Sequence, residues 1–263
     1  MKMLQSGAGS FPFEDGAHRL LTVWYYAPSP IRTGTPILFV MHGCKRNGQE
    51  YRDTWIEHAK KKHTILLAPE FSKGSFRGSS AYNLGGVSPS GPANNRSHWS
   101  FTSIERIFDM VITDARLAAR GYSIYGHSAG AQFVHRMIIF MPEARIEKAV
   151  AANAGWYTMA DFDKSFPYGL KDMAVKPQDM KMALQKRLTI LLGAKDTNDK
   201  NLRNTLEAKA QSKDRVERGK AFYKQGKKLA TKLGVPYAWD IKIVPGVGHK
   251  NSRMAPAAVK VIF

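Results

Sequence analysis

Short apolar runs alternate with helical stripes of apolar residues along most of this chain. Runs typical of buried strands cover residues 35–41, 64–69, 122–125, 148–153, 188–193 and 239–244, and an alternating pattern typical of a half-buried strand covers 19–26. Apolar residues at helical spacing predict helices near 49–62, 104–120 and 213–233 and directly after residue 128. This alternation is typical of a doubly wound, mostly parallel α/β sheet, and we expect about eight strands flanked by helices.

The length of the chain and the lack of internal repeats predict one large domain over residues 1–263. At 29.4 kDa and with 43% hydrophobic residues, the chain can bury a full core. Thr102 and Glu105 form a capping-box pattern that predicts the start of a helix. Residues 71–99 and 155–178 are long irregular stretches, and loops of this length in a compact domain are usually functional. We therefore expect both loops to border the active site.

The segment Gly126-His127-Ser128-Ala129-Gly130 follows a predicted strand and precedes a predicted helix. G-x-S-x-G in this strand–turn–helix context is the nucleophile elbow of serine hydrolases. The turn is so tight that a Cβ on either glycine would collide with neighbouring backbone. The helix N-terminus behind the serine offers free N–H groups to an oxyanion. Because a chain with 22 glycines contains the bare pattern by chance in roughly one case in ten, the interpretation needs partner residues.

Suitable partners follow Ser128 in the chain order of the α/β class of hydrolases. Asp196 comes just after a predicted strand, and His249 lies on a glycine-rich loop after the last predicted strand. A serine hydroxyl needs a base to take its proton, and a carboxylate holds the tautomer of that base and stabilises the imidazolium. The sequence therefore predicts a catalytic triad of Ser128, His249 and Asp196, with Asp199 as the nearest competing acid. His135, on the predicted helix after Ser128, is expected to be a packing or solvated residue.

A further predicted strand, at 35–41, ends at His42-Gly43-Cys44. In this fold class the loop after that strand donates one oxyanion N–H, and the residue after the nucleophile donates the other. The donors would be the backbone N–H groups of Cys44 and Ala129. Because only backbone groups take part, a cysteine is acceptable at position 44. The alternative interpretation is a simple turn at the end of a strand.

Taken together, these motifs resemble α/β-hydrolases of the type that includes polyhydroxybutyrate depolymerases and feruloyl esterases. The matching segments are Met41-His42-Gly43-Cys44, the elbow from Gly126 to Gly130, Asn153-Ala154-Gly155-Trp156, Asp196 and Gly248-His249. The resemblance extends from about residue 20 to the end, and it implies the α/β-hydrolase fold and a serine esterase. One departure is that secreted members often carry disulfides, whereas this chain has a single cysteine.

Aromatic residues of the two long loops are candidates for the substrate pocket. Tyr82 and Trp99 lie in the first loop, and Trp156 lies in the second. Both loops follow the C-terminal ends of strands and should border Ser128, so these rings could form an acyl or aryl pocket. The alternative is that the rings close the core over the sheet edge.

The chain is strongly basic, with 40 Lys and Arg against 21 Asp and Glu and a formal net charge of +19. The basic residues concentrate at 60–62, 181–187 and 200–232, and the helix expected at 213–233 is amphipathic with a cationic outer face. Such a surface either serves solubility or attracts anionic polymers, lipid head groups or negatively charged substrates. No nucleic-acid motif accompanies the charge, so we expect no dedicated nucleic-acid binding.

The N-terminal sequence and the cysteine count favour a cytoplasmic protein. The chain shows no signal segment, no apolar run of transmembrane length and only one cysteine. A secreted form with a trimmed signal stays open, and the sequence leaves the oligomeric state undetermined.

The sequence thus predicts a serine hydrolase, most simply a carboxylic ester hydrolase that forms an acyl-enzyme and needs no cofactor or metal. Its partner would be a small-molecule or polymeric ester. Amide, thioester or polyester cleavage by the same residues is the alternative within enzymes. The alternative from another class is a non-catalytic binding protein on a hydrolase fold, against which the ordered set of three residues argues.

Overall fold

The computed structural model describes residues 3–87, 95–198 and 202–263. Its strands are β1 (Gly7–Glu14), β2 (Leu20–Ala27), β3 (Ile37–Met41), β4 (Ile65–Glu70), β5 (Tyr122–His127), β6 (Ile146–Ala152), β7 (Leu188–Gly193) and β8 (Asp240–Val244). Its helices are α1 (Gly48–Lys61), the 3-10 turn η2 (Arg96–His98), α2 (Ser100–Asp114), α3 (Ala129–Phe140), α4 (Pro177–Leu184), α5 (Leu206–Gln211), α6 (Arg215–Leu233) and α7 (Asn251–Ile262).

These strands form one eight-stranded sheet in the order β1-β2-β4-β3-β5-β6-β7-β8. β2 is antiparallel to both of its neighbours, and the strands from β4 to β8 are parallel. After β3, the chain places β4 on one side of that strand and β5 on the other, so the order of strands reverses between β3 and β5. In open α/β sheets such a switch point is where ligands bind. The predicted mostly parallel, doubly wound sheet is confirmed.

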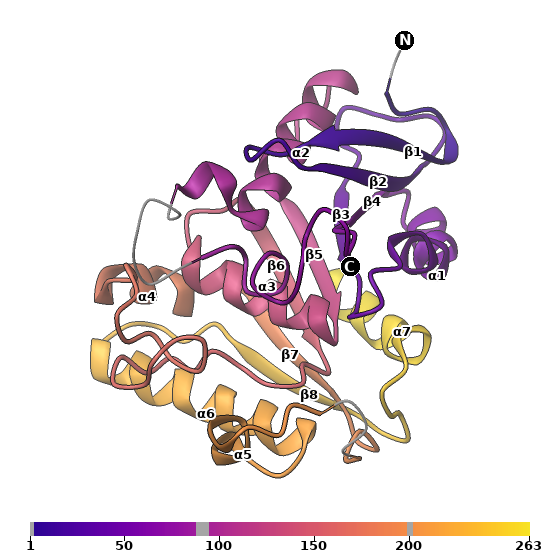
Figure 1. Cartoon of the computed structure of the whole chain (residues 1–263). Helices are drawn as coiled ribbons and strands as arrows, with labels where there is room; N and C mark the ends of the chain where they lie inside the picture. Colours follow the sequence, from indigo (N-terminus) through magenta and orange to yellow (C-terminus); the bar gives the residue numbers. More distant parts are fainter. Residues whose placement is uncertain (1–2, 88–94, 199–201) are drawn as a thin grey trace.

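Helices cover both faces of the sheet (Figure 1). α1 and α7 pack on one face, where Trp55, Tyr125 and Met254 belong to a single buried cluster. α2, α3, α4 and α6 contribute to a larger cluster on the other face, which includes Phe108 and Phe222. Every residue of β3 and of β7 is buried, as expected for central strands that are covered on both sides.

The edge strand β1 is not among the strands that the sequence predicted. Its sequence, GAGSFPFE, contains two glycines and a proline, which weaken a strand signal. Among the described strands, β1 pairs with β2 alone. An edge strand tolerates proline because one row of its N–H groups has no partner strand.

The start of α2 differs from the prediction. The helix begins at Ser100, so Thr102 lies inside its first turn. The Thr102 hydroxyl donates to the Arg96 carbonyl at 2.5 Å. The Glu105 carboxylate accepts hydrogen bonds from the Tyr122 hydroxyl and the Arg145 guanidinium. The capping-box interpretation is therefore wrong, because both side chains bond to groups outside the predicted cap.

The long basic helix near the C-terminal end is α6. It buries Val216, Phe222 and Leu229, and it exposes Lys227 and Lys228 to solvent. This distribution confirms the amphipathic pattern. None of the helices in the described residues is both long enough and apolar enough to cross a membrane.

Candidate active site

Ser128 lies at the sharp turn between β5 and α3. It adopts φ 59° and ψ −115°, a conformation that strains a non-glycine residue. A Cβ on Gly126 would lie 2.2 Å from the Gly130 carbonyl oxygen, and a Cβ on Gly130 would lie 2.1 Å from the Met41 carbonyl oxygen. Only glycine fits at either position, so the turn has the geometry of a nucleophile elbow.

Hydrogen bonds join the Ser128 side chain to two other predicted residues. Its Oγ lies 3.0 Å from Nε2 of His249, and Nδ1 of His249 lies 2.6 Å from Oδ2 of Asp196. The Asp196 side chain is 0% exposed and the His249 side chain is 28% exposed. The structure therefore brings the three residues into one chain of hydrogen bonds, in which the imidazole can receive the serine proton.

Strand pairing explains why these three residues meet. Ser128 follows β5, Asp196 follows β7 and His249 follows β8, and Gly193 pairs with Val244 where the last two strands end. Neighbouring strands lie about 4.8 Å apart, so loops at the same edge of the sheet come within reach of one another's side chains.

Arg215 binds the other carboxylate oxygen of Asp196. Its Nη1 lies 3.2 Å from Oδ1 of Asp196 and 3.0 Å from the Asn198 carbonyl oxygen, and its side chain is 3% exposed. The carboxylate is thus fixed between His249 and a buried cation. Arg215 is the first residue of α6, where the helix dipole disfavours positive charge, and this mismatch is the sequence signal that points to it. The competing acid Asp199 lies outside the described residues.

Asn153, at the end of β6, forms hydrogen bonds to the segments that carry Asp196 and His249. It adopts φ 53°, its Oδ1 accepts a hydrogen bond from the Gly193 N–H at 2.7 Å, and its Nδ2 donates to the Gly248 carbonyl at 3.1 Å. A Cβ on Gly193 would lie 2.6 Å from the Val247 carbonyl oxygen. These contacts hold the segment that carries His249 against the sheet.

The loop after β3 lies beside the elbow because Met41 pairs with Gly126. A Cβ on Gly43 would lie 3.8 Å from the Cβ of Ser128. Cys44 and Ala129 both line the cleft in front of Ser128. Their backbone N–H groups have no intramolecular acceptor in the part of the chain that the structure describes. Two free donors at this place suit the negative charge that develops on a carbonyl oxygen.

Tyr82, a predicted pocket residue, does not line this cleft. Its side chain is fully buried, and its hydroxyl donates to the His42 carbonyl at 2.7 Å. Nε2 of His42 accepts a hydrogen bond from the Phe71 N–H at 3.0 Å, and Arg46 stacks on the Tyr82 ring and donates to the Phe71 carbonyl. Tyr82 therefore braces the loop that carries Cys44, and its ring stays out of reach of a substrate.

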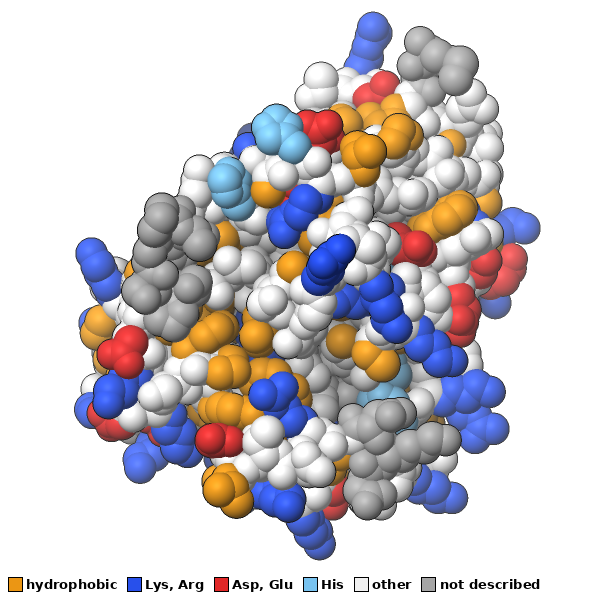
Figure 2. Space-filling model, viewed as in Figure 1, with side chains coloured by type: hydrophobic (Ala, Val, Ile, Leu, Met, Phe, Trp, Pro, Cys, Tyr) orange, Lys and Arg blue, Asp and Glu red, His pale blue; other side chains and the backbone are white. Residues whose placement is uncertain are grey.

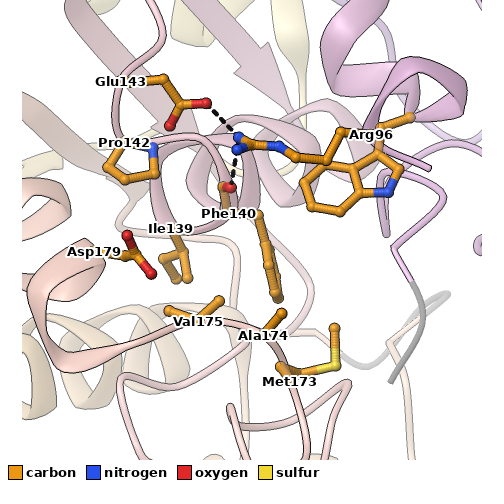
Figure 3. Close-up of a pocket in the computed structure, with 10 residues that line it drawn as sticks. Arg96, Ile139, Phe140, Pro142, Glu143, Met173, Ala174, Val175 and Asp179 are labelled. Carbon is orange, nitrogen blue, oxygen red and sulfur yellow. Dashed lines mark hydrogen bonds and ion pairs between the residues drawn. The ribbon is translucent and has the colours of Figure 1, made fainter. Parts of the chain in front are cut away.

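Trp99, a second predicted pocket residue, lines a different and smaller cavity of about 230 Å³. Arg96 and Phe140 line the same cavity (Figure 3). Arg96 lies over the Trp99 ring at 5.2 Å and also bonds to Glu143 and to the Phe140 carbonyl. This cavity lies at the C-terminal end of α3, whereas Ser128 is the N-cap of the same 12-residue helix, about 18 Å away along its axis. Trp99 therefore lies at the end of α3 opposite to Ser128 and does not line the cleft beside that serine.

Ser128 and His249 open onto a cleft of about 800 Å³. Trp156, the third predicted pocket residue, does line this cleft. The charged residues that line it are Lys45, Glu50, Arg203, Arg215 and Lys250, all cationic except Glu50. Lys and Arg side chains are spread over the face shown in Figure 2. Among the described residues, no group of three or more His, Cys, Asp or Glu is placed to hold a metal ion.

Three buried histidines lie around the elbow and its helix. Burial lowers the pKa of His42 to about 3 and holds the pKa values of His127 and His135 well below the usual 6.5. Nδ1 of His127 lies 3.2 Å from the Tyr51 hydroxyl, and its ring lies 4.7 Å from the ring of His249. A neutral His127 places no positive charge beside the imidazole of His249.

These histidines make stability depend on pH. Below about pH 6.5 they bind protons in the unfolded chain but stay neutral in the folded chain, so stability is highest above that pH and falls as the pH drops. Between pH 7 and pH 5 each should remove about 2 kcal/mol from the free energy of unfolding. We expect a His135→Gln variant to lose about 2 kcal/mol less over this range in urea titrations. A variant of the exposed His98, His98→Gln, should keep the wild-type slope. An unchanged slope for His135→Gln would contradict a neutral His135.

No protein-family model and no curated protein sequence matches this chain. Among solved structures, the chain is similar to poly(aspartic acid) hydrolase-1 from Sphingomonas sp. KT-1, with 46% identity over 98% of this chain and 99% of that one and a TM-score of 0.95. It is also similar to the poly(3-hydroxybutyrate) depolymerase LpqC from Bordetella parapertussis, with 31% identity over 100% and 92% of the two chains and a TM-score of 0.93. An acetyl xylan esterase from Aspergillus awamori, at 14% identity over 97% and 98% of the chains and a TM-score of 0.60, shares the fold.

The first two similarities extend over nearly the full length of both chains, so they go beyond a shared fold. They also agree with the resemblance that the elbow and the loop after β3 indicated. The chain is therefore a hydrolase that belongs to the esterase and depolymerase family of α/β-hydrolases.

Proposed function

We propose that this protein is a serine hydrolase that cleaves carboxylic acyl bonds through an acyl-enzyme on Ser128. The observation that carries the proposal is the hydrogen-bond chain from Ser128 through His249 to the buried Asp196, at the wall of a large cleft. The nucleophile, base and acid are already in contact without a substrate, and two free backbone N–H donors line the same cleft.

In the first half of the reaction, Nε2 of His249 takes the Ser128 proton while Oγ attacks the carbonyl carbon of the substrate. The N–H groups of Cys44 and Ala129 stabilise the negative charge on the carbonyl oxygen. The imidazolium, stabilised by Asp196, then gives its proton to the leaving oxygen or nitrogen. The bond to the leaving group breaks, and the acyl group remains on Ser128 as an ester.

In the second half, a water molecule replaces the leaving group. His249 takes one proton from the water while the water oxygen attacks the acyl carbon. The tetrahedral intermediate collapses, the bond to Oγ breaks and the proton returns to Ser128. The carboxylic acid leaves, and Ser128 and His249 return to their starting protonation states.

For the substrate, we favour a polyanionic polymer such as poly(aspartic acid). The 46%-identical relative is described as a poly(aspartic acid) hydrolase, and this chain has a net charge of +19. The cationic lining of the cleft would raise the local concentration of an anionic polymer. The scissile bond would then be an amide, which the same acyl-enzyme path cleaves as it does an ester.

A neutral polyester is the second candidate. It is favoured by the 31% identity to a poly(3-hydroxybutyrate) depolymerase. Small carboxylic esters, the simplest substrate that the sequence predicted, share the reacting group with both polymers and serve as probes of the chemistry.

Two measurements test this function. A fluorophosphonate probe should label Ser128, as located by mass spectrometry of the digested protein, because a base activates this serine. Size-exclusion chromatography should show shortening of poly(aspartic acid). No label on Ser128 would instead favour a binding protein on a hydrolase fold, and shortening of poly(3-hydroxybutyrate) alone would select the polyester.

A further inference from the structure

Arg203 lines the active-site cleft and is held in one orientation by aromatic groups. Its guanidinium lies 4.7 Å from the centre of the Trp156 ring and 5.4 Å from that of Tyr168. Its Nε also donates a hydrogen bond to the Tyr168 hydroxyl. A flexible side chain on an exposed loop is thus fixed at the cleft wall, next to Trp156.

A second guanidinium contacts the same indole from inside the protein. Arg136 is fully buried and lies 4.2 Å from the centre of the Trp156 ring. Its hydrogen-bond partners are uncharged: the Thr158 hydroxyl at 2.8 Å, the Asn83 carbonyl at 3.0 Å and Gln132. Its Nη2 is buried without a hydrogen-bond partner among the described residues.

The charges of Arg136 and Arg203 are not neutralised by an ion pair among the described residues. Within the residues that the structure describes, no Asp or Glu forms an ion pair with Arg136 or Arg203. Burial lowers the pKa of Arg136 well below the usual 12.5, and the nearby charge of Arg203 lowers it further. Hydrogen bonds to its own backbone and to Thr205 lower the pKa of the exposed Glu207, and the charge of Arg203 contributes less, without an ion pair between the two residues.

The other cations that line the cleft are either already paired with a carboxylate or not held in one orientation by hydrogen bonds. Arg215 is already paired with Asp196. Lys45 and Lys250 are exposed, with no hydrogen bond or ion pair of their ammonium groups in the described structure. Arg203 alone combines an accessible position, a fixed orientation and a buried cation behind it without a counter-charge. This combination favours binding of an anion, because a carboxylate on Arg203 would relieve the repulsion between the two guanidinium groups.

We propose that Arg203, seated on Trp156, is the residue that selects substrates by binding a carboxylate carried by the polymer in the cleft. The planar fork of the guanidinium suits bidentate binding of a carboxylate, and stacking on the indole keeps part of its hydrogen-bonding edge available. The inference rests on the proposed function, since it names the group of the substrate that the same cleft recognises. Trp156 acts in it as the platform that orients Arg203.

Binding is the first test, because it needs no turnover. In a Ser128→Ala background, isothermal titration with an aspartate hexamer should give a Kd that Arg203→Gln raises about tenfold or more. Arg120→Gln is the matched control, since it removes the same charge from an exposed residue just before the N-terminal end of β5, at the opposite edge of the sheet from Ser128. The control should change the Kd less than twofold. Arg203→Lys should fall between the two, because it keeps the charge and loses the fork.

Selectivity is the second test. The ratio of kcat/KM for the 4-nitrophenyl monoester of adipic acid to that of 4-nitrophenyl hexanoate should fall about tenfold in Arg203→Gln and stay unchanged in Arg120→Gln. Equal losses in the two variants would show a general charge effect and overturn the proposal. A Kd and a selectivity ratio within twofold of wild type for Arg203→Gln would overturn it as well. If the Ser128→Ala protein still cleaved esters, the proposed function would fail, whereas the binding result would stand on its own.

Discussion

Replacement of Ser128 by alanine should lower the rate of acyl-bond cleavage by about 10⁴- to 10⁶-fold. Alanine removes the oxygen that forms the acyl-enzyme in the proposed mechanism, so that His249 has no hydroxyl to activate. The backbone of the elbow and the contacts of its two glycines stay the same, so the variant should fold. Turnover of 4-nitrophenyl butyrate, with circular dichroism as a check on folding, measures the effect.

A matched control for this experiment is Ser10→Ala, on the exposed side of the edge strand β1. It makes the same chemical change away from the cleft and should retain wild-type turnover. If the Ser128→Ala protein kept more than about a tenth of wild-type activity, Ser128 would not be the nucleophile.

Replacement of Asp196 by asparagine should lower turnover by about 10⁴-fold. An amide cannot stabilise the imidazolium as a carboxylate does, and it can present an N–H to Nδ1 of His249 and so select the wrong tautomer. The change also removes the charge of Asp196 from its buried ion pair with Arg215. We therefore expect a loss of about 3–5 kcal/mol in the free energy of unfolding, as is typical when one partner of a buried ion pair is removed.

Catalysis and stability must be separated in this variant. Activity per folded molecule, obtained from kcat together with a urea titration, isolates the loss at His249 from the loss of folded protein. Asp199→Asn is the comparison, since Asp199 is the nearest competing acid, and it should cost little. The reverse ranking of the two variants would assign the acid to Asp199.

The candidate catalytic residues could be predicted from the sequence because each lies just beyond the end of a strand. A buried run followed by Gly126 to Gly130 marks the elbow, and the two later strands are followed by Asp196 and His249. Parallel strands place their C-terminal ends at one edge of the sheet, so the chain order was enough to predict that these loops meet. The edge strand β1 escaped detection because its glycines and proline hide the period of two.

For the long loops, the sequence pattern was not enough to predict which side chains line the cleft. Tyr82, Trp99 and Trp156 are all aromatic residues of long loops, and the local pattern cannot tell them apart. In the structure Tyr82 supports the loop of Cys44, Trp99 faces another cavity, and only Trp156 lines the cleft. The difference lies in which distant segment each ring packs against.

The sequence by itself determined the alternation of strands and helices, the elbow and the order of the three candidate catalytic residues. These features depend on periodicity, on glycine sterics and on the parallel sheet, all of which act over short stretches of chain or through strand order. Only the tertiary structure decided that Arg215 pairs with Asp196 and that Arg203 and Arg136 share the ring of Trp156. Those contacts join loops and helices far apart in the chain, and a long cationic side chain carries no periodic signal of the partner that it will reach.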